Sequence, residues 1–334
     1  MDKKPFLSVK DLSVEYTSGG AVIKAVNHVS FDLEAGGTLG LVGETGAGKT
    51  TIAKAILKIL PDMGSRIASG EIFLNGQDML KLPEKEMLHI RGNQISMIFQ
   101  DPMTALNPVQ TIGDQISEGI LLHNKITKEE ARDIAIDMLK MVGITEERYN
   151  NYPHQFSGGM KQRVVIAMAL ACNPKLLLAD EPTTALDVTI QAQVLEMIRD
   201  IKEKLNTSLI LIPHDLGVVA EMCDNVAIVY AGEIIEYGSK RHIFKNPSHP
   251  YTKGLFQSLP SMSQKSGRLH PIAGLPPDPS NLPDGCKFHE RCPYASEECA
   301  KQEMALKEME PGHWCSCMKS NCQAGAAKYL KEGE

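Results

Sequence analysis

An octet at positions 43–50, GETGAGKT, constrains the fold of this 334-residue chain more than any other segment. It matches the phosphate-binding pattern G-x-x-x-x-G-K-[ST], in which glycines let backbone N–H groups curl around phosphate oxygens. Lys49 is then expected to reach the β and γ phosphates, and the Thr50 hydroxyl to face Mg²⁺. The octet lies between the apolar run LGLVG and a helical pattern from about Lys49 to Leu60, which predicts a nucleotide-binding α/β fold.

The rest of the pattern extends this α/β core. Residues 5–43 alternate apolar and polar side chains and indicate an antiparallel β entry, whereas the apolar runs at 95–99, 175–180 and 208–212 predict buried parallel strands. Residues 111–172 carry only helical patterns, with a capping box at Thr127 and Glu130. We expect no strand after Gly238, where Pro and Gly become frequent.

Charge and hydropathy argue against binding to nucleic acid and against direct insertion into a membrane. A net charge of −6 and a pI near 6.0 disfavour nucleic acid. The first residues, MDKKPFLSVKDLSVEY, lack the apolar core of a signal peptide, and no run approaches the roughly 20 apolar residues that span a bilayer. We therefore expect a cytoplasmic chain that reaches membranes only through partners.

Two further segments suit nucleotide chemistry. KLLLADE ends an apolar strand with Asp180, placed to support Mg²⁺, and Glu181, placed to orient or deprotonate water; acidic turn residues after a buried strand are also common without function. FSGGMKQR places Ser157 as the N-cap of a helix whose mouth carries two glycines, and such an end attracts anions. As an isolated string it is equally a capped helix.

The ordered set of motifs resembles the ABC ATPase family over residues 5 to about 240. The resemblance implies a P-loop NTPase ABC nucleotide-binding domain over 1–240, with an antiparallel β subdomain and a helical subdomain at about 101–172, followed by a Cys-rich C-terminal extension over 241–334. It also implies that the mouth of the SGG helix binds the γ-phosphate of ATP held by an opposite subunit, so that one chain carries two half-sites.

The resemblance assigns roles residue by residue. The catalytic group is Glu181, the switch histidine His214 and the Q-loop Gln100; Mg²⁺ is held through Thr50, Gln100 and Asp180. ATP is contacted by Tyr16, Gly43, Glu44, Thr45, Gly46, Ala47, Gly48, Lys49, Thr50 and Thr51, the opposite ATP by Ser157, Gly158, Gly159 and Met160, and the second subunit by the D-loop residues Ala185, Leu186 and Asp187. Phe156, Met160 and Pro213 depart from the commonest family pattern, and Pro213 removes a backbone donor beside His214.

The segment NPSHPYTKGLFQSLP, at 246–260, resembles the extension of oligopeptide and dipeptide importer ATPases. This implies a second ATPase subunit, related but different, two membrane permeases docked near Gln100, an external substrate-binding protein, and a peripheral position on the cytoplasmic face of the membrane. Nickel, glutathione or another small solute stays open as cargo. A soluble ABC ATPase acting on ribosomes or DNA, and a metal-sensing regulator, are the alternatives from other classes.

A cysteine cluster occupies about 286–322. Cys286, Cys292, Cys299 and Cys315 follow a spacing close to the four-cysteine pattern that binds a [4Fe–4S] cluster in some of these ATPases, with Cys317 as the alternative fourth ligand. Cys₄ zinc uses the same donors, His289 and His313 could join a zinc site, and Cys322 adds to the ambiguity. Cluster, zinc and no metal all remain open.

Overall fold

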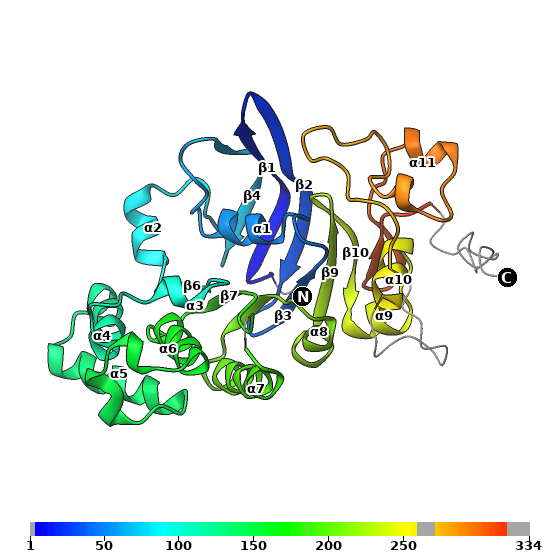
Figure 1. Cartoon of the computed structure of the whole chain (residues 1–334). Helices are drawn as coiled ribbons and strands as arrows, with labels where there is room; N and C mark the ends of the chain where they lie inside the picture. The colour runs from blue at the N-terminus through cyan, green and yellow to red at the C-terminus, as the bar shows by residue number, and fades with distance from the viewer. Residues whose placement is uncertain (1–3, 185, 259–270, 319–334) are drawn as a thin grey trace.

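The computed structural model describes residues 4–184, 186–258 and 271–318. An eight-stranded sheet runs through the molecule in the order β11-β12-β10-β9-β3-β8-β7-β6, and a four-stranded sheet in the order β2-β1-β4-β5 lies beside it (Figure 1). The large sheet contains β3 (Thr38–Val42), β6 (Ile95–Ile98), β7 (Leu176–Asp180), β8 (Ser208–Ile212), β9 (Asn225–Tyr230), β10 (Glu233–Ser239), β11 (Lys307–Glu310) and β12 (His313–Cys315). The smaller sheet contains β1 (Leu7–Ser18), β2 (Ala21–Leu33), β4 (Ser65–Leu74) and β5 (Gln77–Asp78).

The central strands confirm the parallel sheet predicted from their apolar runs. Strand β3 pairs in parallel with β8 and β9, and β7 pairs in parallel with β6 and β8, whereas β1 is antiparallel to β2 and β4. Successive side chains along β7 enter different cores: Leu176 and Leu178 face the smaller sheet, and Leu177 and Ala179 face the helices. Burial on both faces explains the continuous apolar runs.

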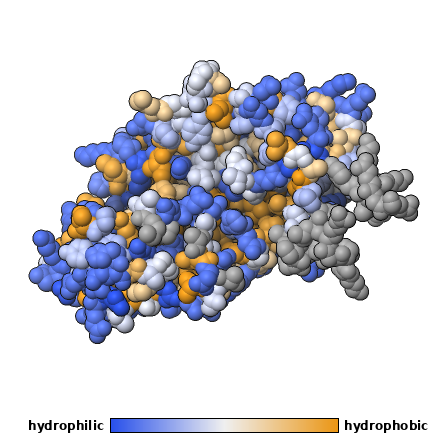
Figure 2. All heavy atoms as spheres, viewed as in Figure 1, coloured by the Kyte–Doolittle hydropathy of each residue, from blue (hydrophilic) through white to orange (hydrophobic). Residues whose placement is uncertain are grey.

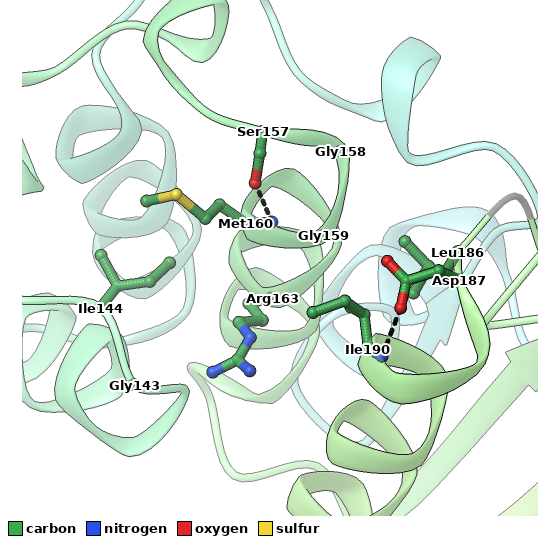
Figure 3. Close-up of a pocket in the computed structure, with 10 residues that line it drawn as sticks. All are labelled: Gly143, Ile144, Ser157, Gly158, Gly159, Met160, Arg163, Leu186, Asp187 and Ile190. Atoms are coloured by element: carbon green, nitrogen blue, oxygen red, sulfur yellow. Dashed lines mark hydrogen bonds between the residues drawn. The ribbon is translucent and has the colours of Figure 1, made fainter.

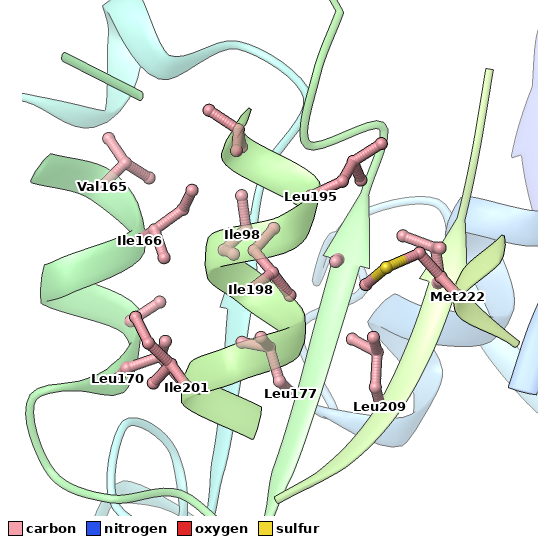
Figure 4. Close-up of a cluster of buried hydrophobic side chains, with 14 of the residues drawn as sticks. Ile98, Val165, Ile166, Leu170, Leu177, Leu195, Ile198, Ile201, Leu209 and Met222 are labelled. Atoms are coloured by element: carbon pink, nitrogen blue, oxygen red, sulfur yellow. The ribbon is translucent and has the colours of Figure 1, made fainter. Parts of the chain in front are cut away.

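Helices pack on both faces of the large sheet: those at 49–56 and 84–90 lie in the core shared with the smaller sheet, and those at 158–170, 188–205 and 216–222 lie on the opposite face. The described helices are α1 (Lys49–Ile56), α2 (Glu84–Ile90), α3 (Pro102–Ala105), α4 (Ile112–His123), α5 (Lys128–Met141), α6 (Gly158–Leu170), α7 (Val188–Leu205), α8 (Leu216–Met222), α9 (Lys240–Lys245), α10 (Pro250–Gln257) and α11 (Glu297–Lys301), with 3-10 turns at Glu146–Asn150, Pro153–Gln155 and His289–Arg291. Figure 4 shows Ile166 and Leu170 of α6 and Ile198 of α7 packed over strand residues such as Leu177 and Leu209. The capping box at Thr127 and Glu130 is present.

Two expectations about element boundaries were wrong. Helix α1 ends at Ile56 rather than near Leu60, because Lys58 adopts a positive φ of 54° that a helix cannot continue through. Strands do not end after Gly238, since β12 pairs antiparallel with β10, with Trp314 opposite Tyr237, and β11 pairs with β12. The C-terminal segment therefore extends the central sheet at the end opposite β6, beside which the helical insertion lies (Figure 1).

Candidate active site

The glycine-rich loop lies between β3 and α1, and its backbone geometry requires glycine. Gly48 caps α1 with φ of +102°, and a Cβ there would lie 2.3 Å from the Ala25 carbonyl oxygen. At Gly43 a Cβ would lie 2.1 Å from the carbonyl oxygen of Val229. Because real Cβ atoms do not approach oxygen so closely, the loop is fitted tightly against β2 and β9. This close fit holds the backbone N–H groups of the loop at the N-terminus of α1.

Lys49 lies across the loop with its ammonium group among oxygens. Its Nζ donates to the carbonyl oxygens of Gly43 and Glu44, each at 2.8 Å, and only 9% of the residue is exposed. Burial lowers the pKa of Lys49, and the nearby carboxylates of Glu181, Asp180 and Glu44 oppose that shift. A cation in this position is placed to meet phosphate oxygens.

The carboxyl end of β7 brings the predicted acidic pair to the loop. Thr50 Oγ1 donates to Asp180 Oδ1 at 3.1 Å, so two of the three residues expected to hold Mg²⁺ are in direct contact. Burial raises the pKa of Asp180, and the hydrogen bond from Thr50 opposes the rise. Hydroxyl and carboxylate oxygens are the donors that Mg²⁺ prefers, so this pair fits the ion expected with ATP.

Glu181 is held by two side-chain donors. Gln100 Nε2 donates to Glu181 Oε2 at 2.7 Å, and Thr184 Oγ1 donates to the same oxygen at 2.9 Å. Glu181 itself has a φ of +47°, an uncommon conformation for a residue with a side chain. A residue with a side chain that keeps a positive φ at the end of a buried strand is typical of functional sites.

Other predicted residues lie around this centre at different distances from it. His214 is exposed two residues beyond β8, whose last residue, Ile212, is opposite Asp180. Tyr16 Oη lies 3.4 Å from Thr51 Oγ1 at the start of α1, so the tyrosine is on the loop's side of the small sheet. Glu44 is on the loop, and its contacts are described below.

The SGG segment forms a second, separate pocket (Figure 3). Ser157 is the N-cap of α6, as predicted, and its Oγ accepts from the Met160 N–H at 3.4 Å. Asp187 caps α7 by accepting from the Ile190 N–H at 3.0 Å. The pocket is lined by Gly143, Ile144, Ser157, Gly158, Gly159, Met160, Arg163, Leu186, Asp187 and Ile190. None of these belongs to the glycine-rich loop, and Ala185 lies outside the described residues.

Cysteines of the C-terminal segment line one cavity. Cys286, Cys292, Cys299 and Cys317 surround it with His249, Pro250, Phe288, His289 and Tyr294. Cys315, the first choice for a fourth ligand, is not among the lining residues; it is fully buried on β12 opposite Glu236 of β10. Cys322 lies outside the described residues, and His313 instead contacts Glu236.

These four thiols line a cavity, but they do not converge on one position where a single metal ion could bind. Across residues 4–184, 186–258 and 271–318, no three His, Cys, Asp or Glu side chains are grouped so that they could hold a metal ion. Four thiols spread around one cavity nevertheless match the donor set of an iron–sulfur cluster, in which each cysteine binds a different iron. Burial raises the pKa of both the Cys286 and the Cys292 thiol to about 11, which disfavours their thiolate forms.

Sequence reasoning missed two residues that touch the glycine-rich loop. Arg291 Nη1 and Nη2 donate to the Glu44 carboxylate at 2.8 and 3.0 Å, and the Glu44 N–H donates to Tyr251 Oη at 3.0 Å. Both partners come from the C-terminal extension. Tyr251 belongs to the recognised His-Pro-Tyr segment, but no sequence signal pointed to Arg291.

In the described part of the chain, no helix is both long enough and apolar enough to cross a membrane.

Residues 26–184 match the family described as ABC transporter, and residues 235–299 match the family described as oligopeptide/dipeptide transporter, C-terminal region. The second match covers the segment that carries Tyr251 and Arg291.

Curated relatives match nearly the whole length of the chain. The chain is 49% identical over 313 residues to the dipeptide transport ATP-binding protein DppD of Bacillus subtilis (strain 168), covering 93% of each. It is 47% identical over 315 residues to the oligopeptide transport ATP-binding protein OppD of Escherichia coli (strain K12), covering 94% of this chain and 93% of that one.

Solved structures share the fold over most of the chain. The ATP-binding cassette MJ0796, in a dimeric post-hydrolysis state bound to ADP and Pi, matches with a TM-score of 0.64 at 27% identity, covering 70% of this chain and 99% of that one. The cbiO1 protein of Clostridium perfringens, part of the ABC transporter complex cbiONQ, matches with a TM-score of 0.63 at 26% identity, covering 73% and 92%. The chain therefore belongs to the ABC transporter ATP-binding family, in the branch of the dipeptide and oligopeptide transport ATP-binding proteins.

Proposed function

We propose that this chain is the ATP-hydrolysing subunit of an importer that takes up dipeptides or oligopeptides through membrane permeases. The observation that carries the ATPase part is the convergence of Lys49, Thr50, Asp180 and Glu181 where β3 and β7 end. The peptide part is supported by the names of its nearly half-identical relatives and by the match of residues 235–299.

Each group in the site then has one task. Lys49 binds the β and γ phosphates, and Thr50 and Asp180, with Gln100, hold Mg²⁺. Glu181 orients the attacking water and accepts its proton while the water oxygen bonds to the γ-phosphorus and ADP departs. Tyr16 stacks on adenine, and His214 contacts the γ-phosphate. The hydrogen bond from Gln100 to Glu181 supports this scheme because it couples the metal-sensing residue to the proposed base.

The second pocket binds the nucleotide of another subunit. Its separation from the chain's own loop supports this assignment, as do the N–H groups that α6 presents beside Ser157, Gly158 and Gly159. Leu186 and Asp187, which line the same pocket, form the contact with the second cassette. That cassette is a related but different chain, and closing the pair completes both ATP sites.

The permeases dock near Gln100 on the cytoplasmic face of the membrane. Large hydrophobic side chains around this region are exposed: Leu88 on α2 by 60%, Phe99 by 44%, Val109 by 78% and Leu122 on α4 by 73%. Figure 2 shows hydrophobic residues among hydrophilic ones over the part of the surface where α2 and α4 lie. Exposed apolar groups of this kind support a protein partner. Cargo reaches the permeases from an external binding protein, and nucleic acid takes no part.

Cargo class is tested by uptake in cells that lack this chain. Cells complemented with the wild-type chain should recover uptake of labelled dipeptides and oligopeptides, and cells carrying Lys49→Ala should not. Labelled nickel and glutathione are measured in parallel as the competing cargoes. Recovery of nickel or glutathione uptake without peptide uptake would contradict the peptide assignment while leaving the ATPase assignment in place.

We further propose that Cys286, Cys292, Cys299 and Cys317 hold a [4Fe–4S] cluster. Their placement around one cavity supports this ligand set, and the position of Cys315 in the sheet supports Cys317 as the fourth ligand. When bound, such a cluster would crosslink the loops of the C-terminal segment and add a redox-sensitive group to it.

Metal analysis after anaerobic purification separates the two candidate ligands. We expect about four irons per wild-type chain and a broad absorbance near 400 nm, as four-cysteine cluster ligation predicts. Cys317→Ala should lower the iron content, whereas Cys315→Ala should keep it. The reverse order would restore Cys315 as the ligand, and one zinc per chain in place of iron would contradict the cluster.

A further inference from the structure

The C-terminal extension holds the phosphate-binding loop through two of the three polar parts of Glu44, its carboxylate and its N–H. The Glu44 carboxylate accepts from both terminal nitrogens of Arg291, at 2.8 and 3.0 Å. Its N–H donates to Tyr251 Oη at 3.0 Å, and its carbonyl oxygen accepts from Lys49 Nζ at 2.8 Å. Two of these three contacts come from residues more than 200 positions away along the chain.

Arg291 is itself fixed from several sides. Only 7% of it is exposed, its Nε donates to the Ala273 carbonyl oxygen at 3.1 Å, and its Nη1 also donates to Tyr230 Oη at 3.2 Å. Burial by itself would lower the pKa of Arg291. The hydrogen bonds to Glu44 and Tyr230 outweigh this effect and raise the pKa overall, so the guanidinium stays charged. A bidentate contact between an arginine and a carboxylate fixes the orientation of the two groups as well as the distance between them.

Tyr251 is equally constrained. It is fully buried on α10, and its ring centroid lies 4.6 Å from that of Tyr230 and 5.4 Å from that of Phe288. Phe288 also lines the cysteine cavity, and Arg291 directly precedes Cys292. The loop is therefore anchored to a short turn of the extension and to an aromatic cluster in which Tyr251 and Phe288 come from the extension and Tyr230 comes from β9.

The charge of Glu44 makes this anchor relevant to ATP. An unpaired carboxylate on a loop that holds phosphates would repel them, and the repulsion is strong where water is partly excluded. Glu44 is 26% exposed at its side chain and is paired with Arg291. The arginine neutralises the carboxylate, and its contact with Tyr230 holds the guanidinium in place.

We propose that Arg291, assisted by Tyr251, is a positioning residue that keeps the phosphate loop in its ATP-binding conformation and shields bound phosphates from the charge of Glu44. This role rests on the proposed function only in taking ATP as the ligand of the loop. It makes the C-terminal extension a determinant of nucleotide affinity. Arg291 is not a catalytic residue, because it acts on the nucleotide through Glu44.

The test is the dissociation constant for MgATP, measured with the full-length chain for Arg291→Gln, Glu44→Gln and the double variant. Arg291→Gln is expected to weaken MgATP binding about tenfold, equivalent to about 1.4 kcal/mol, because the arginine acts on the nucleotide only through the partly exposed Glu44. Glu44→Gln gives the reference affinity of a loop without the carboxylate, and the double variant should bind MgATP about as well as Glu44→Gln does, which recovers most of the loss. A merely structural arginine would give no such recovery, since removing Glu44 cannot rebuild lost packing.

Two further variants keep the result decisive if Arg291→Gln folds poorly. Tyr251→Phe removes only the hydroxyl that accepts from Glu44 and should weaken MgATP binding about threefold, the loss of one neutral hydrogen bond. Arg199→Gln, in the exposed pair with Glu221, is the matched control and should leave binding unchanged. Wild-type affinity in both Arg291→Gln and Tyr251→Phe would overturn the positioning role alone. Failure of the wild type to bind MgATP would overturn the proposed function and this role with it.

Discussion

Replacing Lys49 with alanine is expected to abolish measurable MgATP binding. Lys49 is the cation on the glycine-rich loop, and three carboxylates, those of Glu181, Asp180 and Glu44, surround it. Two charge-assisted hydrogen bonds to phosphate oxygens would be lost, which weakens binding at least about 100-fold. The same change leaves Asp180 and Glu181 without their nearby cation, so their carboxylates would also repel the nucleotide.

Equilibrium titration of the purified chain with MgATP checks this expectation. Lys54→Ala is the matched control, because Lys54 lies on the same helix α1 and has no hydrogen bond to the loop among those described. Its affinity should stay within about threefold of the wild type, because Lys54 influences the site through its charge near Asp180 rather than through a contact with the loop. Equal affinities of Lys49→Ala and wild type would show that ATP does not use this loop.

Replacing Glu236 with alanine is expected to lower the free energy of unfolding by about 3–5 kcal/mol, the cost of breaking a buried charged network by removing one partner. Glu236 is fully buried and accepts from the Ser248 N–H at 2.6 Å, the His249 N–H at 2.9 Å and His313 Nε2 at 2.8 Å. Burial raises the pKa of Glu236, but the hydrogen bonds from His313 and its other donors outweigh this and lower it overall. The carboxylate thus joins β10 to the start of α10 and to β12.

Urea unfolding followed by circular dichroism measures the effect. Glu221→Ala is the control, because Glu221 forms an exposed pair with Arg199, and such pairs contribute within about 1 kcal/mol. Since Glu236 supports α10, its loss should also weaken the contact that Tyr251 makes with the loop. A Glu236→Ala chain as stable as the wild type would contradict the account of how the extension is attached.

Local patterns predicted the core of the fold because burial imposes them. The run SLILI at 208–212 became β8 with the predicted bounds, and Ser157 caps α6 as its position before two glycines suggested. Strands β11 and β12 were missed because they are only four and three residues long, and Lys307–Glu310 contains Met309 as its single apolar residue. Pairing with β10 stabilises them, and no local periodicity records that.

The candidate site was predictable in its parts but not in its connections. The motifs identified Lys49, Asp180 and Glu181, since each follows a recognisable strand or glycine-rich turn. The contacts of Tyr251 and Arg291 with Glu44 span 207 and 247 positions, and nothing in the spacing of those residues indicates that they meet. Which of Cys315 and Cys317 lines the cysteine cavity was not predictable for the same reason, because only the pairing of β12 with β10 turns Cys315 into the sheet.

The central claim is ATP hydrolysis with Glu181 acting on the attacking water, and its most direct test is to measure MgATP binding and turnover together for wild type and Glu181→Gln. Glutamine keeps the size of the side chain but cannot accept the proton, so turnover should fall at least about 100-fold. Binding should remain within about threefold, since Glu181 does not hold the phosphates. Loss of turnover with retained binding would support the account, and unchanged turnover in Glu181→Gln would contradict it.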